Sequence, residues 1–191
     1  MRAIRHLLLA AGIMSLHGIC AASPASPYAG QETRQIKALS AEDVSSYLAG
    51  KGMGLAKTAE LNGYPGPLHV LELAEQLKLS AQQKAKTQEL YNAMQAKAIE
   101  AGRALIDAEQ KLDRLFASRA ISPDLLDSSL KEIGALQAKV RGIHLEAHLQ
   151  QAGILDAEQV ARYNALRGYD KDNKAPSGSD ASPHHGHGHK H

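Results

Sequence analysis

The sequence predicts an all-α protein, an elongated helical hairpin of two long helices with shorter flanking helices. Composition is the first observation, because the 191 residues include no Trp, one Phe and only 4% aromatic residues. The apolar residues are mostly Ala and Leu, which favour helices, whereas a β-sandwich or β-barrel needs more Val, Ile and aromatic residues. The second observation is two long stretches with helical periodicity, each opened by a serine that suits a helix N-cap.

The N-terminus has the pattern of an export signal. The positively charged "MRAIRH" precedes the mostly apolar "LLLAAGIMSLHGIC", and small residues with cleavage points after Ala22 or Ala25 follow. An uncleaved membrane anchor is the alternative, but the apolar run is short and His17 interrupts it. We therefore expect residues 1–22 to be a signal peptide that is removed during export.

Charge and cysteine content limit the classes of partner. Removal of residues 1–22 takes away Cys20, the one cysteine, so the mature chain has neither a disulfide nor a thiolate metal ligand. It also removes Arg2 and Arg5, so the 22 basic residues fall to 20 and equal the 20 acidic residues. Because the chain then has no net charge and no basic block, we do not expect it to bind nucleic acid.

Residues 23–66 are expected to contain an arm, a short helix and a further helical turn or two. Residues 23–39 are small and polar and suit a flexible N-terminal arm. Ser40 is a good N-cap, and Asp43 three residues later completes a capping box for the first helix. The glycines of "GKGMG" end that helix. A helical turn or two follows and stops at Gly63, which suits a left-handed C-cap.

The first long helix is expected at residues 81 to about 117. Pro67 opens the helix before it, "PLHVLELAEQLKL", as a first-turn proline. Ser80 then caps the long helix while Gln83 reaches back to the Ser80 amide, and such a cap contributes about 1 kcal/mol. Apolar or small residues recur at steps of three and four and form one stripe: Leu90, Met94, Ala98, Ala101, Leu105, Ala108, Leu112 and Leu115.

The second long helix begins after Ser122, with Pro123 in its first turn. Its expected stripe is Leu126, Leu130, Ile133, Leu136, Val140, Ile143 and Ala147. Asp156 caps a last short helix that runs to about Leu166, which completes a helical domain at residues 40–168. The stripes hold much alanine, so the core is thin, and we expect a homodimer to bury a second face.

The C-terminal residues 169–191 are expected to form a disordered His/Gly-rich tail. They lack periodicity and are rich in Pro, Gly, Ser and charge. The final "HHGHGHKH" is either a native metal-binding tail or an affinity tag, and its interruption by Gly and Lys favours the native tail. Flexible glycines let several imidazoles reach one ion at a cost in ordering entropy. The candidate ligands in the tail are His184, His185, His187, His189 and His191.

One motif occurs twice, on either side of the long hairpin. "LSAQQ" at 79–83 and "LDAEQ" at 155–159 share a leucine, a capping residue and a glutamine three residues later. Taken alone, each is an ordinary helix start. Together they resemble the motif of the LTxxQ superfamily of periplasmic proteins, with Ser80 and Asp156 in place of the usual threonine. The motif residues are Leu79, Ser80, Gln83, Leu155, Asp156 and Gln159.

This resemblance spans roughly residues 65–167. The superfamily includes the Spy/CpxP chaperone and stress proteins, the zinc-resistance-associated proteins and the periplasmic heavy-metal sensors. It implies a periplasmic location, a curved helical dimer, and a role in envelope stress through either unfolded proteins or metal ions. It also implies that the motif leucines and glutamines shape helix junctions. Zinc-resistance-associated relatives end in Gly/His-rich tails as well, which supports a native tail.

His144 and His148 form a His-x-x-x-His pair on the second long helix. Residues four apart lie on one helix face, about 6 Å from each other, and two imidazoles suit Zn, Ni, Co or Cu ions. Glu146 is not where a metalloprotease helix of the His-Glu-x-x-His type places its general base, so we reject a zinc hydrolase. The alternative is two partly buried histidines without a ligand.

His69 and Glu72 are further candidate ligands on the helix opened by Pro67. If that helix packs near the histidine pair, four ligands converge; otherwise these are one histidine and one solvated carboxylate. The resemblance is the reason to name these two positions, since heavy-metal sensors of the superfamily use His and Glu from separate helices.

No Ser/His/Asp set, phosphate-binding glycine loop or carboxylate pair is placed for catalysis, so we expect neither an enzyme nor an organic cofactor. We expect a periplasmic envelope-stress or metal-resistance protein that binds divalent transition metals through histidines. The alternative is an ATP-independent periplasmic chaperone that shields unfolded proteins. Unfolded clients or a membrane sensor are the corresponding partners.

Overall fold

The computed structural model describes residues 26–169, which fall into two compact units divided after Glu32. In the first unit, residues 26–32 form turns, and the Gln31 amide donates to the Tyr28 carbonyl at 3.0 Å. The predicted signal peptide and all but the first residue of the predicted tail lie outside the described residues. No helix between residues 26 and 169 is both long enough and apolar enough to cross a membrane.

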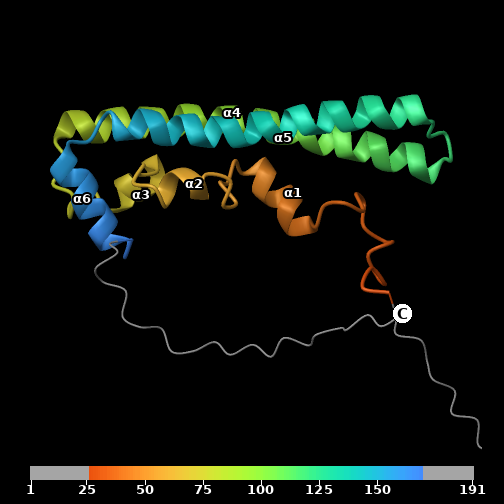
Figure 1. Cartoon of the computed structure of the whole chain (residues 1–191), viewed down its shortest axis with the longest axis horizontal. Coiled ribbons are helices and arrows are strands. Elements are labelled where there is room, and N and C mark those ends of the chain that lie inside the picture. The colour runs from red at the N-terminus through yellow and green to blue at the C-terminus, as the bar shows by residue number, and fades with distance from the viewer. Residues whose placement is uncertain (1–25, 170–191) are drawn as a thin grey trace, which may run out of the picture. The chain divides into compact units, whose positions relative to one another are not determined.

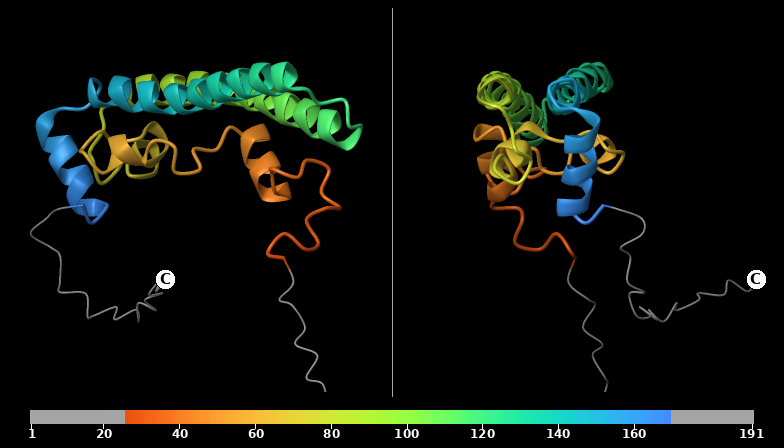
Figure 2. Two further views of the ribbon diagram at one scale, coloured as in Figure 1. Left: turned by 45° about the vertical axis from the view of Figure 1, so that its right-hand side comes forward. Right: turned by 90° about the vertical axis from the view of Figure 1, so that its left-hand side faces the viewer.

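In residues 33–169, the regular secondary structure consists of helices and includes no strand, which confirms the predicted fold class. Its helices are α1 (Ala41–Leu48), α2 (Lys57–Glu60), α3 (Pro67–Glu72), α4 (Ala81–Ala117), α5 (Pro123–Ala152) and α6 (Ala157–Leu166). Helices α4 and α5 pack side by side as an antiparallel hairpin (Figures 1 and 2). Helices α1, α2 and α3 follow one side of the hairpin, and α6 lies at its open end.

The seam of the hairpin, meaning the line of residues on α4 and α5 that face each other, follows a seven-residue period. Two long helices stay in contact only if the facing residues recur about every 3.5 positions. On α4 the seam includes Thr87, Met94, Ala98, Ala101, Leu105 and Ala108, all buried. On α5 the prediction of Leu130 in the stripe is wrong: its side chain is 53% exposed, and Ser129 is buried in its place. The Ser129 hydroxyl donates to the Leu125 carbonyl at 2.7 Å, so its burial leaves no polar atom unsatisfied.

Helix α1 crosses α4 at Gly102. A Cβ atom on Gly102 would lie 2.7 Å from the carbonyl oxygen of Tyr47, closer than any side chain permits. Glycine in the middle of a helix costs about 1 kcal/mol relative to alanine. The close approach of α1 explains why α4 has a glycine here, and Tyr47 packs on the core formed by Ala101, Leu105 and their neighbours.

Helix α3 is shorter than the sequence predicted. It ends at Glu72 instead of continuing to Leu79, and Lys78 adopts a positive φ of 51°. The bend buries Leu77 at 1% exposure, together with Val70, Leu155 and Tyr163, in a cluster at the open end of the hairpin. Tertiary packing of Leu77 thus overrides the local preference for helix.

The two repeated motifs form the predicted capping boxes and also contact each other. Ser80 with Gln83 and Asp156 with Gln159 exchange the reciprocal hydrogen bonds of the box. In addition, Gln83 Nε2 donates to Gln159 Oε1 at 2.8 Å and to the Ile154 carbonyl at 3.0 Å. The motif glutamines therefore bind the start of α4 to the start of α6.

The C-terminal end of the predicted arm, residues 36–38, contacts α4. Ile36 is buried, at 4% exposure. The Lys37 amide donates to Asp113 Oδ1 at 3.3 Å, and Lys37 Nζ lies 3.2 Å from Asp113 Oδ2. These contacts place residues 36–38 against the second half of α4.

Candidate functional site

Three of the histidines predicted as ligands, His69, His144 and His148, line a cavity of about 620 Å³. The loop from α1 to α2, the start of α3, and the facing parts of α4 and α5 form its walls. Its apolar lining includes Met53, Leu61, Leu68, Tyr91 and Met94, and its charged or titratable lining includes Glu60, His69, His144 and His148. Three of the four predicted ligands outside the tail therefore face one cavity.

His144 lies on the seam of α5 and is 4% exposed. Its Nε2 atom is buried and has no hydrogen-bond partner among the described residues. Burial, followed by the charge of neighbouring His148, lowers the pKa of His144, so the ring is held neutral. A neutral imidazole with an unpaired nitrogen at a cavity wall is the form that binds a metal ion or a hydrogen-bonding ligand.

His148 is oriented by the backbone of the loop before α3. Its Nδ1 lies 2.7 Å from the Tyr64 carbonyl oxygen, which can only accept, so Nδ1 carries a proton. In the neutral form of the ring, the lone pair is therefore on Nε2. A Cβ atom on Gly66 would lie 3.0 Å from that Nε2 and would crowd it. A backbone carbonyl that fixes the tautomer of a histidine is the usual support of a metal ligand.

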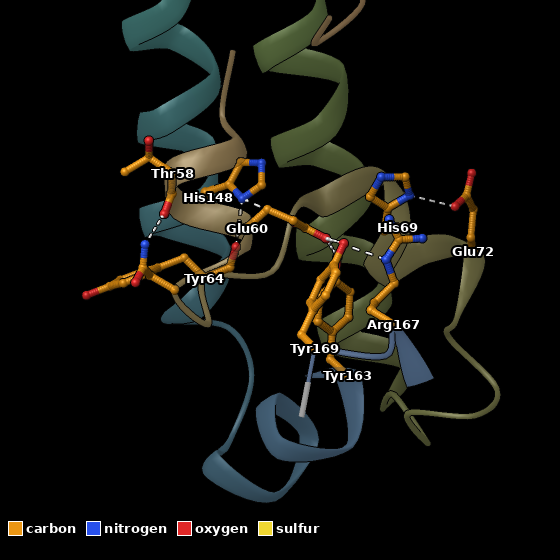
Figure 3. Close-up of polar contacts among 10 residues, drawn as sticks. Thr58, Glu60, Tyr64, His69, Glu72, His148, Tyr163, Arg167 and Tyr169 are labelled. Carbon is orange, nitrogen blue, oxygen red and sulfur yellow. Dashed lines mark hydrogen bonds and ion pairs between the residues drawn. The ribbon is translucent and has the colours of Figure 1, made fainter. Parts of the chain in front are cut away.

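Glu60 on α2 is a part of the site that sequence analysis missed. Its Oε1 accepts hydrogen bonds from Tyr163 at 2.5 Å and Tyr169 at 3.1 Å, and Arg167 Nε lies 3.5 Å away (Figure 3). Its Oε2 is buried without a hydrogen bond and lies 3.7 Å from His148 Nδ1. Nothing in the sequence around Glu60 marks it, because its partners are about one hundred positions away.

The contact with Glu60 also affects the pKa of Tyr163. Burial raises the pKa of Tyr163, and the hydrogen bond to Glu60 raises it further, so the hydroxyl stays protonated and donates. With both tyrosines donating to one oxygen, the Glu60 carboxylate is held in place (Figure 3). Its second oxygen, Oε2, is buried beside the His148 ring.

His69 and Glu72 pair with each other instead of converging on the other histidines. His69 Nδ1 lies 2.8 Å from Glu72 Oε2, and Glu72 is not among the residues that line the cavity (Figure 3). Within residues 26–169, no three His, Cys, Asp or Glu side chains are grouped so as to hold a metal ion. The five tail histidines lie outside the described residues.

The site therefore offers the imidazole rings of His144 and His148 at one mostly apolar cavity, with the Glu60 carboxyl beside His148. Imidazole and carboxylate suit Zn, Ni, Co or Cu, and two histidines at i and i+4 form the minimal chelating unit. Such a pair leaves the remaining coordination positions open to water, to a further ligand of the chain or to a bound molecule.

Comparison of the chain with protein-family models, with curated proteins and with solved structures found no match in any of the three. The resemblance to the LTxxQ superfamily therefore stays a prediction.

Proposed function

We propose that this protein binds a divalent transition-metal ion through His144 and His148, and that it does so in the periplasm as a metal-resistance or envelope-stress protein. One observation carries the proposal. The buried Nε2 of His144 has no hydrogen-bond partner among the described residues, and it lies one helical turn before His148 on the same cavity. A buried polar nitrogen without a partner costs about 1–3 kcal/mol, which a bound ion would recover.

Three further features support this proposal. His144 is neutral, so metal binding does not have to displace a proton from it. The Tyr64 carbonyl fixes the His148 tautomer, and Gly66 leaves its Nε2 uncrowded. Glu60 Oε2 lies 3.7 Å from His148 Nδ1 and accepts no hydrogen bond, so a carboxyl group lies beside the histidine pair.

The site suits exchangeable binding instead of a permanent structural metal. A structural zinc site is closed by four protein ligands, whereas no three His, Cys, Asp or Glu side chains within residues 26–169 are grouped around one point. Water or tail histidines would complete the coordination. Incomplete coordination gives modest affinity and fast exchange, as expected of a metal buffer.

Calorimetric titration with Zn, Ni and Cu tests the proposal on two chains, residues 23–191 and residues 23–170. We expect the shorter chain to bind more tightly than about 100 μM and His144→Leu to weaken its binding at least about tenfold. His69→Gln is the control, because its ring already pairs with Glu72, and we expect less than about a threefold change.

Two outcomes separate the parts of the proposal. Loss of binding on truncation would assign the metal to the tail and refute the helical site. If neither chain binds more tightly than about 100 μM, the metal-binding function is refuted altogether. Circular dichroism of His144→Leu checks that the helices persist.

A chaperone function is the second candidate, and a specific observation favours it. Met53, Leu61 and Leu68 line the cavity yet are 41%, 57% and 42% exposed, so apolar surface continues from the cavity to the outside. Such a surface suits an apolar segment of an unfolded chain. We expect the chain to suppress aggregation of a denatured client. The paired change Leu61→Gln with Leu68→Gln should abolish suppression, and Leu149→Gln, which is exposed but outside the cavity, should not.

A further inference from the structure

A second hollow of about 460 Å³ lies between residues 36–38 and the second half of α4. It shares no lining residue with the histidine cavity. Its lining is mostly apolar, and it also contains two carboxyl groups and one lysine: Ile36, Lys37, Ala38, Glu109, Leu112, Asp113, Phe116 and Ala117. Its volume is within the range of cavities that bind small molecules, about 300–1,000 Å³.

Glu109 is the unusual member of this lining. It is only 9% exposed, and no hydrogen bond or ion pair joins its carboxyl to any other described residue. Burial raises the pKa of the Glu109 carboxyl. The carboxyl oxygens keep contact with solvent, since neither is among the fully buried atoms that lack a hydrogen bond. In a mostly apolar lining, a carboxyl without a protein partner favours a ligand that supplies one.

The lysine of this hollow does not serve Glu109. Lys37 is engaged with Asp113, through its backbone amide at 3.3 Å and its ammonium group at 3.2 Å. This pair balances one positive and one negative charge. The negative charge of Glu109 is therefore the one that the lining leaves uncompensated.

We propose that this hollow binds a small organic amine with an apolar body. The ammonium group pairs with the Glu109 carboxylate, and the body packs on Ile36, Leu112 and Phe116. An anion is disfavoured because it would face two carboxylates, and an uncharged apolar molecule would leave Glu109 unpaired. A charge-assisted hydrogen bond in an apolar surrounding is about twice as strong as a neutral one, so the charge decides the ligand class.

Titration of residues 23–191 with 4-phenylbutylamine and with 4-phenylbutanol tests the proposal. The two probes share one apolar body and differ in the charged group. We expect the amine to bind at least about tenfold more tightly than the alcohol. We expect Glu109→Gln to reduce the affinity for the amine to that for the alcohol. Glu100→Gln is the matched control on the exposed side of the same helix, and it should change neither affinity.

Phe116→Ala provides a second test that does not depend on the charge. Phe116 is 54% exposed, so the variant should fold, and loss of its ring should weaken both probes by a similar factor. Equal affinities of amine and alcohol, or the same amine affinity in Glu109→Gln and Glu100→Gln, would overturn the proposal. An amine affinity that Phe116→Ala leaves unchanged would also overturn it. Glu109→Gln removes a buried charge and is expected to fold at least as stably as the wild type, so its binding can be measured.

Discussion

The two ends of the α4–α5 hairpin are built in opposite ways. At the open end, α3 and α6 cover the hairpin, and Leu77 and Tyr163 are almost fully buried. At the tip, where α4 connects to α5, no other helix of residues 26–169 covers the pair, and Phe116, Leu125 and Leu130 are 54%, 42% and 53% exposed. Two helices alone bury only one seam, so any further apolar residue needs a third element to cover it.

The same difference explains where the candidate site is found. The histidines and Glu60 lie where the flanking helices add a second layer to the hairpin. Burial in this second layer lowers the pKa of His144. An identical pair of histidines near the tip would be solvated, and its rings would titrate as ordinary surface histidines.

The largest effect we expect is a loss of unfolding free energy when a packed side chain at the open end is shortened. Leu77→Ala at the covered end should lower the free energy of unfolding by about 2–5 kcal/mol, because it leaves a cavity among buried side chains. Leu130→Ala at the tip should change it by less than about 0.5 kcal/mol. Urea unfolding followed by circular dichroism measures both. Equal losses would show that the tip is covered in solution, as the expected homodimer could do.

A smaller effect is expected from the polar cluster at the covered end. Glu60→Ala should cost about 1–3 kcal/mol of unfolding free energy, since it leaves the buried Tyr163 hydroxyl without its acceptor. Glu72→Ala is the control, because it removes an exposed glutamate side chain, and it should cost less than about 0.5 kcal/mol. If Glu60→Ala proves neutral, the cluster around this carboxylate does not contribute to holding α2 against α6.

The junction of the two motifs should show a coupling of about 0.5–1.5 kcal/mol. A double-mutant cycle of Gln83→Ala and Gln159→Ala isolates it, because these side chains exchange two hydrogen bonds. The control cycle uses Gln88 and Asn92, which share an exposed hydrogen bond on α4, and should give about 0.3 kcal/mol or less. Additive losses at the junction would mean that the motifs act separately as helix caps.

The smallest expected effect is a dependence of stability on pH. The pKa of His144 is lower in the folded chain, so the unfolded chain binds more protons as the pH falls below about 6.5. The contribution of His144 to stability is therefore complete above that pH and is lost as the pH falls through the folded pKa. His144→Leu should reduce this loss of stability, and His69→Gln should not. Urea unfolding midpoints measured at about pH 7.5, 6.0 and 5.0, on both sides of the ordinary histidine pKa, test this. A pH profile of His144→Leu that matches the wild type would contradict the assigned burial.

Local signals account for the parts of the fold that the sequence predicted well. Ser80 and Asp156 begin α4 and α6 at the predicted residues, because a capping box involves only residues three apart. Where neighbours in space decide, the prediction was wrong. Leu130 looked like a core residue by its helical spacing, but the pairing of α4 with α5 selected Ser129 instead. Likewise, the burial of Leu77 ended α3 at Glu72.

The candidate site divides in the same way. Spacing alone placed His144 and His148 on one face of α5, because residues four apart in a helix are neighbours whatever the tertiary structure. The same sequence gave no sign of Glu60, whose tyrosine partners are 103 and 109 positions away, or of the Tyr64 carbonyl, 84 positions from His148. The sequence by itself thus determined the helices, their caps and the histidine pair, since these depend on short-range geometry. The tertiary structure alone decided which faces are buried and which polar groups meet, since both depend on contacts between segments that are distant in the chain.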